Sequence, residues 1–217
     1  ISGLSGTGAI SIHDVFSVQD QMTRLQISTP SDHTIVFGTP NGLTANGDKI
    51  EITLPGFDMS GAFTSLDISL TDNVGTKTLA AAPTFAADTW GFNFNDTTKV
   101  LTLTAPVSGS APTSYIAAGS EIVVRVGTNA GGSIQIVNPS TPAGYNISLL
   151  ITNAVGTEYG DIAIPIVDSD QVYVEGYINS YMYFDIDTTT LNEHCGANYM
   201  PSLISDTGER VYEDEPG

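Results

Sequence analysis

Positively charged residues are scarce in this sequence. Lys and Arg total 6, against 24 Asp and Glu, which gives a formal net charge of −18 at pH 7. Because nucleic-acid binding relies on cationic side chains that neutralise phosphates, the composition excludes nucleic acid as an expected partner. The acids are concentrated toward the C-terminus, where residues 158–217 carry thirteen of them and one base.

Cysteine and histidine are also rare, which limits the chemistry available. Cys195 is the single cysteine, so no internal disulfide can form. The three histidines, His13, His33 and His194, lie in no HExxH or HxH spacing, and we expect His13 and His33 to be ordinary surface or turn residues. No G-x-S-x-G elbow, P-loop or dinucleotide fingerprint is present. We therefore expect a protein that is not an enzyme.

Long apolar runs are absent. No stretch approaches the roughly 20 apolar residues of a membrane helix, so we expect no membrane insertion of the mature chain. The sequence begins at Ile1 and shows no basic-then-apolar signal segment. We interpret it as a processed chain that is secreted to the cell exterior or cell surface.

The sequence does contain stretches in which apolar and polar residues alternate. The stretches TANGDKIEITLP (residues 44–55) and IAAGSEIVVRVG (residues 116–127) each place a Gly before an apolar residue at every second position. Period two is typical of a strand with one buried face, and the Gly favours a turn before it. Both stretches are predicted to be equivalent turn-and-strand entries into a sheet.

About ten short runs of this kind follow one another between Gly, Pro and Asn residues. They cover residues 9–18, 22–27, 33–37, 49–54, 64–70, 90–94, 99–104, 121–126, 133–137, 145–152 and 160–167, with a short edge strand at 77–80. This spacing predicts an all-β antiparallel sandwich, immunoglobulin-like or jelly-roll, with extended terminal segments. We divide it into an N-terminal extension (1–18), a sandwich (19–167) and a C-terminal strand or hairpin with an acidic tail (168–217). A helix over 14–25 is the alternative for that segment.

Residues 171–186 alternate for sixteen positions, with a mainly apolar set on even positions and a tyrosine-rich polar set on odd ones. This segment either turns near Asn179 and Ser180 as a hairpin, or it runs past the edge of its own domain and lies against a neighbouring subunit or a following domain. Either it or the segment before residue 19 is a candidate donor strand. The predicted subunit-interface residues are Ile10, Ile12, Phe16, Val18, Val172, Val174, Ile178, Met182 and Phe184.

Pairs of carboxylates two residues apart suggest one cofactor, calcium, which prefers several oxygen ligands. The candidate ligands are Asp168, Asp170, Asp185 and Asp187. Solvated loop acids are the alternative reading, and no other cofactor is expected.

Four segments together carry a family resemblance. They are SDHTIVFGTPNGLTANGDKIEITLPGFD (31–58), AGSEIVVRVG (118–127), IVNPSTPAGYNISLLITN (136–153) and DIAIPIVDSDQVYVEGY (161–177). They resemble a module of secreted bacterial all-β surface proteins, similar to immunoglobulin-like adhesin, surface-layer or extracellular filament subunits. The resemblance implies an immunoglobulin-like fold and no catalytic residues, and it does not extend beyond Asp187.

The expected function is that of a structural subunit of an extracellular filament or cell-surface assembly. Copies of the chain are the predicted partners, joined by a strand that one copy adds to the sheet of the next. The alternative is an adhesion module that binds glycan or protein, with exposed aromatic residues at Trp90 or along Tyr173–Tyr183.

Overall fold

The computed structural model describes residues 14–81 and 88–171. The largest of its three sheets has six strands, in the order β13 (Gly156–Ile166), β12 (Ala143–Asn153), β4 (Lys49–Thr53), β9 (Val100–Thr104), β8 (Thr89–Asn95) and β7 (Thr78–Ala80). All neighbours are antiparallel except β7, which pairs in parallel with β8 at the edge.

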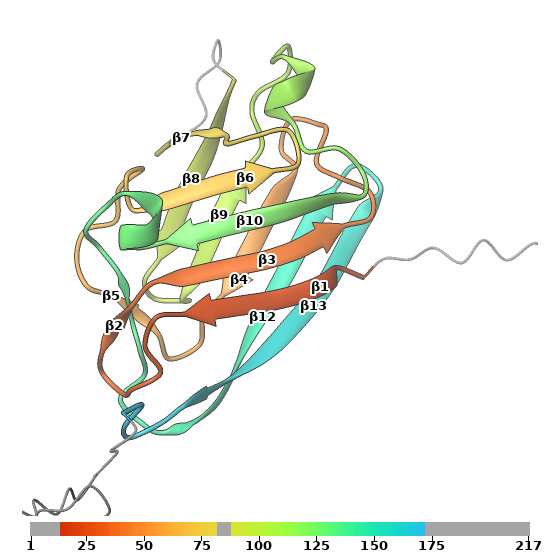
Figure 1. Cartoon of the computed structure of the whole chain (residues 1–217). Helices are drawn as coiled ribbons and strands as arrows, with labels where there is room; N and C mark the ends of the chain where they lie inside the picture. The colour runs from red at the N-terminus through yellow and green to blue at the C-terminus, as the bar shows by residue number, and fades with distance from the viewer. Residues whose placement is uncertain (1–13, 82–87, 172–217) are drawn as a thin grey trace, which may run out of the picture. The chain divides into compact units, whose positions relative to one another are not determined.

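A four-stranded antiparallel sheet packs across it, in the order β1 (Phe16–Met22), β3 (His33–Thr39), β10 (Ser120–Val126) and β6 (Ile68–Asp72). Figure 1 shows these two sheets as the layers of a sandwich. A small sheet of β2 (Pro30–Ser31), β11 (Ile136–Val137) and β5 (Asp58–Met59) lies beside them. Two 3₁₀ turns, η1 (Pro112–Ser114) and η2 (Thr128–Ala130), complete the described elements. The all-β sandwich predicted from the sequence is thus confirmed.

Alternation along the strands produces the core. On β4, Ile50 and Ile52 are fully buried, whereas Lys49, Glu51 and Thr53 are only partly covered. Ile50 and Ile52 are paired with Leu103 and Leu101 of β9, which are also fully buried. Side chains that point inward from both sheets therefore meet in one apolar layer.

The two repeated stretches do form equivalent turn-and-strand entries, but into different sheets. Gly47 (φ 91°) and Gly119 (φ 76°) supply the left-handed turn conformations before β4 and β10. β4 enters the six-stranded sheet and β10 the four-stranded sheet. In the first entry the Asp48 carboxylate also accepts hydrogen bonds from the N–H groups of Thr44 and Ala45, both at 2.8 Å.

Three features differ from the sequence expectations. Strand β1 covers residues 16–22, from the end of the expected run 9–18 to the start of the run 22–27, so the alternative helix over 14–25 is wrong and the expected boundary after residue 18 falls within this strand. Only Ile136 and Val137 of the run 133–137 are in a strand. The expected runs at 145–152 and 160–167 are parts of two eleven-residue strands joined as a hairpin.

Among the described residues no helix is long and apolar enough to cross a membrane.

Candidate functional site

The chain enters the sandwich beside β13. Asp14 forms a parallel bridge with Tyr159, and the Val15 N–H donates to the Tyr159 carbonyl at 2.8 Å. A bulge at Ser17 (φ 55°) then turns the chain across to β3 in the opposite sheet. The crossing is close to β13, because a Cβ at Gly160 would lie 2.9 Å from both Val15 Cβ and Val18 Cγ2.

The chain leaves the described region at the other end of β13. Val167 accepts a hydrogen bond from the Ile27 N–H (2.9 Å) and donates one to the Leu25 carbonyl (3.0 Å). The Asp170 carboxylate accepts two bonds from the Arg24 guanidinium, at 2.7 and 2.9 Å, and one from the Leu25 N–H. We call these contacts the exit clasp. The hydrogen bonds and charge of Arg24 hold the pKa of Asp170 well below its usual range.

Between these two attachments β13 has a free edge. The outward bonds of Tyr159 and Val167 show that odd-numbered residues direct their backbone groups away from β12. In the described part of the chain, 161, 163 and 165 have no backbone partner on that side. Asp161, Ala163 and Pro165 are also exposed. We call this stretch the β13 edge. A surface hollow of about 780 Å³, lined in part by Val18, Leu149 and Tyr159, lies at its start.

The opposite side of the sandwich is closed by the chain itself. The Lys77 N–H donates to the Leu70 carbonyl of β6 at 2.8 Å. The Lys77 side chain is almost fully buried, 2.9 Å from an Asp72 carboxylate oxygen, and it donates to the carbonyls of Thr113 (2.8 Å) and Tyr115 (3.0 Å). The edge of β6 is therefore covered by its own chain.

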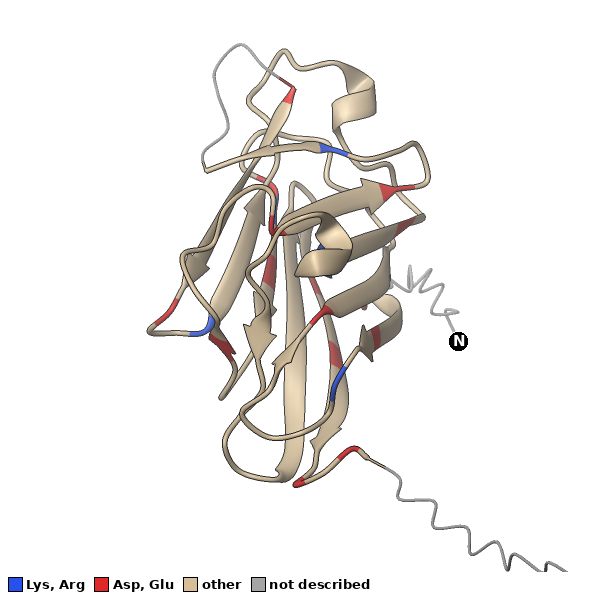
Figure 2. Cartoon of the chain, turned by 60° about the vertical axis from the view of Figure 1, so that its left-hand side comes forward, with Lys and Arg blue, Asp and Glu red and all other residues tan. Residues whose placement is uncertain are grey.

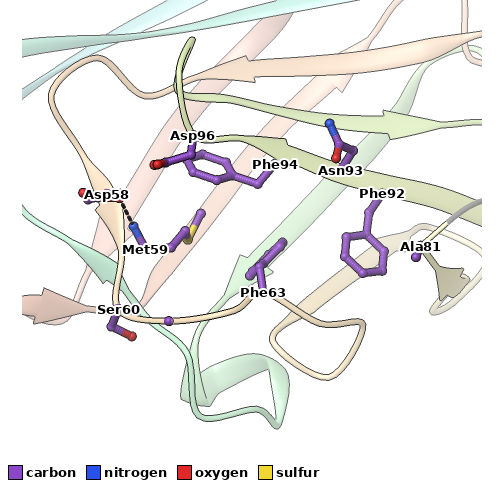
Figure 3. A pocket seen from close by; sticks show the side chains of 10 residues that line it. Asp58, Met59, Ser60, Phe63, Ala81, Phe92, Asn93, Phe94 and Asp96 are labelled. Carbon is purple, nitrogen blue, oxygen red and sulfur yellow. Dashed lines mark hydrogen bonds between the residues drawn. The ribbon is translucent and has the colours of Figure 1, made fainter.

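A second candidate site is a cleft of about 520 Å³ beneath the segment that follows β5. Figure 3 shows Phe63 from that segment facing Phe92 and Phe94 of β8. The Phe63 ring packs edge-on against Phe92 at 5.6 Å and Phe94 at 6.5 Å between centroids. Asn93, Ser60 and Met59 also line it. Its wall thus combines aromatic rings with polar groups, a mixture that is also found in small-ligand sites.

The cleft has an acidic rim that one lysine partly neutralises. Lys99 Nζ lies 2.6 Å from Asp96 and 3.4 Å from Asp58. The pKa of Lys99 is raised, first by its hydrogen bond to Asp96. The pKa of Asp58 is lowered, first by the hydrogen bond from the Met59 N–H. The rim keeps one negative charge in excess at neutral pH.

The predicted interface residues fall into two groups. Phe16 and Val18 are on β1, paired with β3 of the same chain, and Val18 packs against the core while Phe16 is 43% exposed. In the described structure these two residues therefore belong to a strand that is paired within one copy of the chain. The other seven, Ile10, Ile12, Val172, Val174, Ile178, Met182 and Phe184, lie outside the described residues.

One of the four predicted calcium ligands already has a partner within the chain. Asp170 binds Arg24, while Asp168 is exposed. Asp185 and Asp187 are outside the described residues, as are Tyr173–Tyr183. Within residues 14–81 and 88–171, no three His, Cys, Asp or Glu residues lie close enough together to hold a metal ion.

Two expectations about polar and aromatic residues are wrong. His33 is not a surface residue: it is fully buried, and its Nδ1 lies 2.7 Å from the buried Asp20 carboxylate. His33 shares the parity of the inward residues Ile35 and Phe37 on β3, which is the signal that places it inside. Trp90 is not an exposed platform either, because it is fully buried and donates from Nε1 to the Ser114 carbonyl.

No family model matches the chain, and no curated protein matches it. Among solved structures it is similar to the pilus 2b backbone protein of group B streptococcus, with 13% identity and a TM-score of 0.42 over 68% of this chain and 56% of that one. The chain therefore spans about half the length of that protein.

Two further solved structures are similar over most of their own length. The ACE19 collagen-binding subdomain of the Enterococcus faecalis surface protein ACE has 9% identity and a TM-score of 0.39, over 67% of this chain and 92% of that one. An uncharacterized Nocardia farcinica protein with an immunoglobulin-like fold has 13% identity and a TM-score of 0.32, over 74% and 90%. These structures include bacterial surface proteins of the kind that the sequence resembles. The fold assignment itself rests on the strand order and registers above.

Proposed function

We propose that the chain is a structural subunit of an extracellular filament or cell-surface assembly, and that copies associate by adding a strand to one another's sheets. The observation that supports this is the β13 edge. The chain is held at Tyr159 and again at Val167, and between them the outward backbone groups of the exposed residues 161, 163 and 165 have no partner within residues 14–81 and 88–171. An unpaired strand edge accepts a further strand readily.

The geometry of the chain ends supports the same function. Tyr159, where the chain enters, and Val167, where it leaves, are eight residue steps apart along β13 and its continuation, or about 26 Å at 3.3 Å per residue. A contact between the end segment of one copy and the edge of another is head-to-tail, and it builds an open chain of copies when the rotation between neighbours does not close a ring. Repetition of such a contact grows a fibre. Each added backbone hydrogen bond contributes about 0.5–1.5 kcal/mol net.

The test is to look for assembly directly. We expect fibres or oligomers of the purified chain in electron micrographs, and scattering mass that rises with concentration. Deletion of residues 1–13 and deletion of residues 172–217 each remove one candidate donor. A deletion through Val18 is unsuitable, because Val15 is buried and β1 is paired with β3. A chain that remains monomeric at every concentration would contradict the proposal.

The aromatic cleft favours a second function, an adhesion module. Phe63, Phe92 and Phe94 provide apolar contact area, and Ser60, Asn93 and the rim carboxylates provide hydrogen-bonding groups. This combination suits the face of a sugar ring or the side chain of a peptide. A glycan and peptide array should then give a binder that is lost in Phe63→Ala and kept in Leu66→Ala, a matched change at a residue that is 70% exposed outside the cleft lining. Arrays without any binder would contradict this function.

The proposal includes no catalytic role. Four of the buried carboxylates, those of Asp32, Asp48, Asp67 and Glu158, accept hydrogen bonds from loop or side-chain donors. Groups engaged in this way tie loops together.

A further inference from the structure

We infer that the β13 edge of one copy receives residues 1–13 of a second copy. This inference rests on the proposed assembly function and names both the acceptor and the donor. The acceptor follows from the hydrogen bonds of β13, and the donor follows from charge.

The acceptor offers a defined set of backbone groups. Asp161 and Ala163 each present an N–H and a C=O outward, whereas Pro165 presents only a C=O. An incoming strand therefore gains most of its bonds beside 161–163 and few beside 165. The hollow at the start of the edge offers the exposed ring of Tyr159 and the partly exposed side chain of Val18 to its side chains. Residues 1–13 could span about 43 Å when extended, more than the edge requires.

Charge decides between the two terminal segments as donors. The described part of the chain carries fifteen acidic and five basic residues, which Figure 2 shows as a prevalence of Asp and Glu over Lys and Arg. The acceptor itself displays Asp161. Residues 172–217 contain nine acids and one Arg, so their approach is opposed by like charge. Residues 1–13 contain no Asp, Glu, Lys or Arg, and Ile10 and Ile12 fall on one parity.

The direction in which Asp14 pairs with Tyr159 indicates that the donor segment comes from another copy. Asp14 pairs in parallel with Tyr159. A regular continuation of that pairing would match residues before Asp14 with residues before Tyr159, and not with 161–165. The first segment of the same chain would have to reverse its direction to reach the β13 edge, whereas that of a neighbour would not.

Disulfide cross-linking tests the pairing. In a Cys195→Ser background, Ser11→Cys is combined with Ala163→Cys, and the protein is oxidised under assembly conditions. We expect a ladder of covalent dimers and higher species on denaturing gels. Two matched pairs serve as controls: Ser202→Cys with Ala163→Cys, and Ser11→Cys with Glu121→Cys, an exposed residue of β10 in the other sheet. The controls should give no ladder.

A backbone substitution provides the second readout. Ala163→Pro removes one outward N–H, whereas Ala163→Ser keeps it. We expect the proline variant to assemble at least tenfold more slowly than the serine variant, with equal far-UV circular dichroism. Assembly of the unmodified chain without the 11–163 ladder, or with a proline variant that assembles normally, overturns the inference and leaves the proposed function standing. Absence of assembly overturns both.

Discussion

At the scale of single residues, buried carboxylates hold the loops of this sandwich in place. Glu158 accepts bonds from Thr39 Oγ1, the Asn41 N–H and Asn153 Nδ2, and so ties the β12–β13 turn to the turn after β3. Asp32, which lies between β2 and β3, accepts from Thr128 of η2 and from Gln135 before β11. Much of the acidity of the described chain is thus structural and is not available to an external ligand.

Asp67 gives the first prediction. Its carboxylate accepts four hydrogen bonds, from the Thr64 N–H and hydroxyl and from the N–H groups of Ser133 and Ile134. Asp67→Asn replaces one acceptor oxygen by a donor, so we expect a loss of about 2 kcal/mol in the free energy of unfolding at pH 7. Denaturant titration measures this loss, and Asp161→Asn at an exposed position is the control.

The pH dependence of this effect has a definite sign. Burial raises the pKa of Asp67, but the hydrogen bonds from Thr64, Ile134 and Ser133 outweigh it, so the folded pKa lies below its usual value. The stabilisation is therefore full above the unfolded pKa of about 3.9 and is lost as pH falls through the folded pKa. The difference between wild type and Asp67→Asn should therefore shrink as pH falls below the unfolded pKa. A difference that stays constant with pH would show that charge is not its cause.

The Asp20–His33 pair gives the second prediction. Both side chains are fully buried, and Asp20 Oδ1 and His33 Nε2 have no hydrogen-bond partner among the described residues. His33→Leu leaves the Asp20 carboxylate without any partner, which should cost about 3 kcal/mol. Replacement of both residues by Leu removes the polar groups together, and we expect its unfolding free energy to lie within about 1 kcal/mol of wild type.

A double-mutant cycle over these two positions gives the coupling energy. Its control is Met22→Leu with His33→Leu, because Met22 is paired with His33 in the sheet and has no polar group. If the double-leucine protein is as unstable as the sum of its single variants, the two groups do not act as a pair.

At the scale of elements, alternation predicts the strands well and their connections poorly. The inward residues of β4 and β10 could be read from period two, and so could the burial of His33 with Ile35 and Phe37. The crossing at Ser17 could not, because it depends on the contact of Val15 and Val18 with Gly160, more than 140 residues away. The aromatic cleft was equally hidden, since Phe63 comes from an irregular segment without periodicity.

The contribution of the exit clasp to local stability gives the next prediction. Arg24 connects to Asp170, and Asn138 Nδ2 donates to the carbonyls of Arg24 and Gln26. Arg24→Gln removes the bidentate ion pair and leaves these carbonyls in place. We expect faster hydrogen exchange at Ile27 and Val167, a lower melting temperature, and little change at Val15, which is bonded at the far attachment.

Added salt distinguishes the Arg24–Asp170 ion pair of the exit clasp from its backbone hydrogen bonds, which salt does not screen. The Arg24–Asp170 pair is partly exposed, so screening should weaken it and bring wild type closer to Arg24→Gln. Lys49→Gln, which removes a partly exposed pair with Glu51 on β4, is the matched control. Equal exchange rates at Val167 in wild type and Arg24→Gln would show that the ion pair does not secure the exit of the chain.

At the scale of the whole molecule, the net charge of −18 opposes every contact between copies. Residues 172–217 contribute a net −8 of this total, and the described part contributes −10. Assembly should therefore accelerate severalfold as NaCl rises from about 20 mM to about 500 mM, because the Debye length falls below the spacing of surface charges. Deletion of residues 172–217 should reduce this salt dependence by more than half, because the repulsion between two copies scales with the product of their charges.

Time-resolved light scattering measures the effect, and CaCl₂ at the same ionic strength distinguishes its cause. Screening alone requires equal rates in the two salts, or slightly faster rates in CaCl₂ because it is divalent. A rate in CaCl₂ many times higher, and lost in the deletion variant, would assign the effect to cation binding by the C-terminal acids, which include Asp185 and Asp187. Assembly that is slowed by salt would contradict repulsion as the barrier, because screening can only weaken a like-charge interaction.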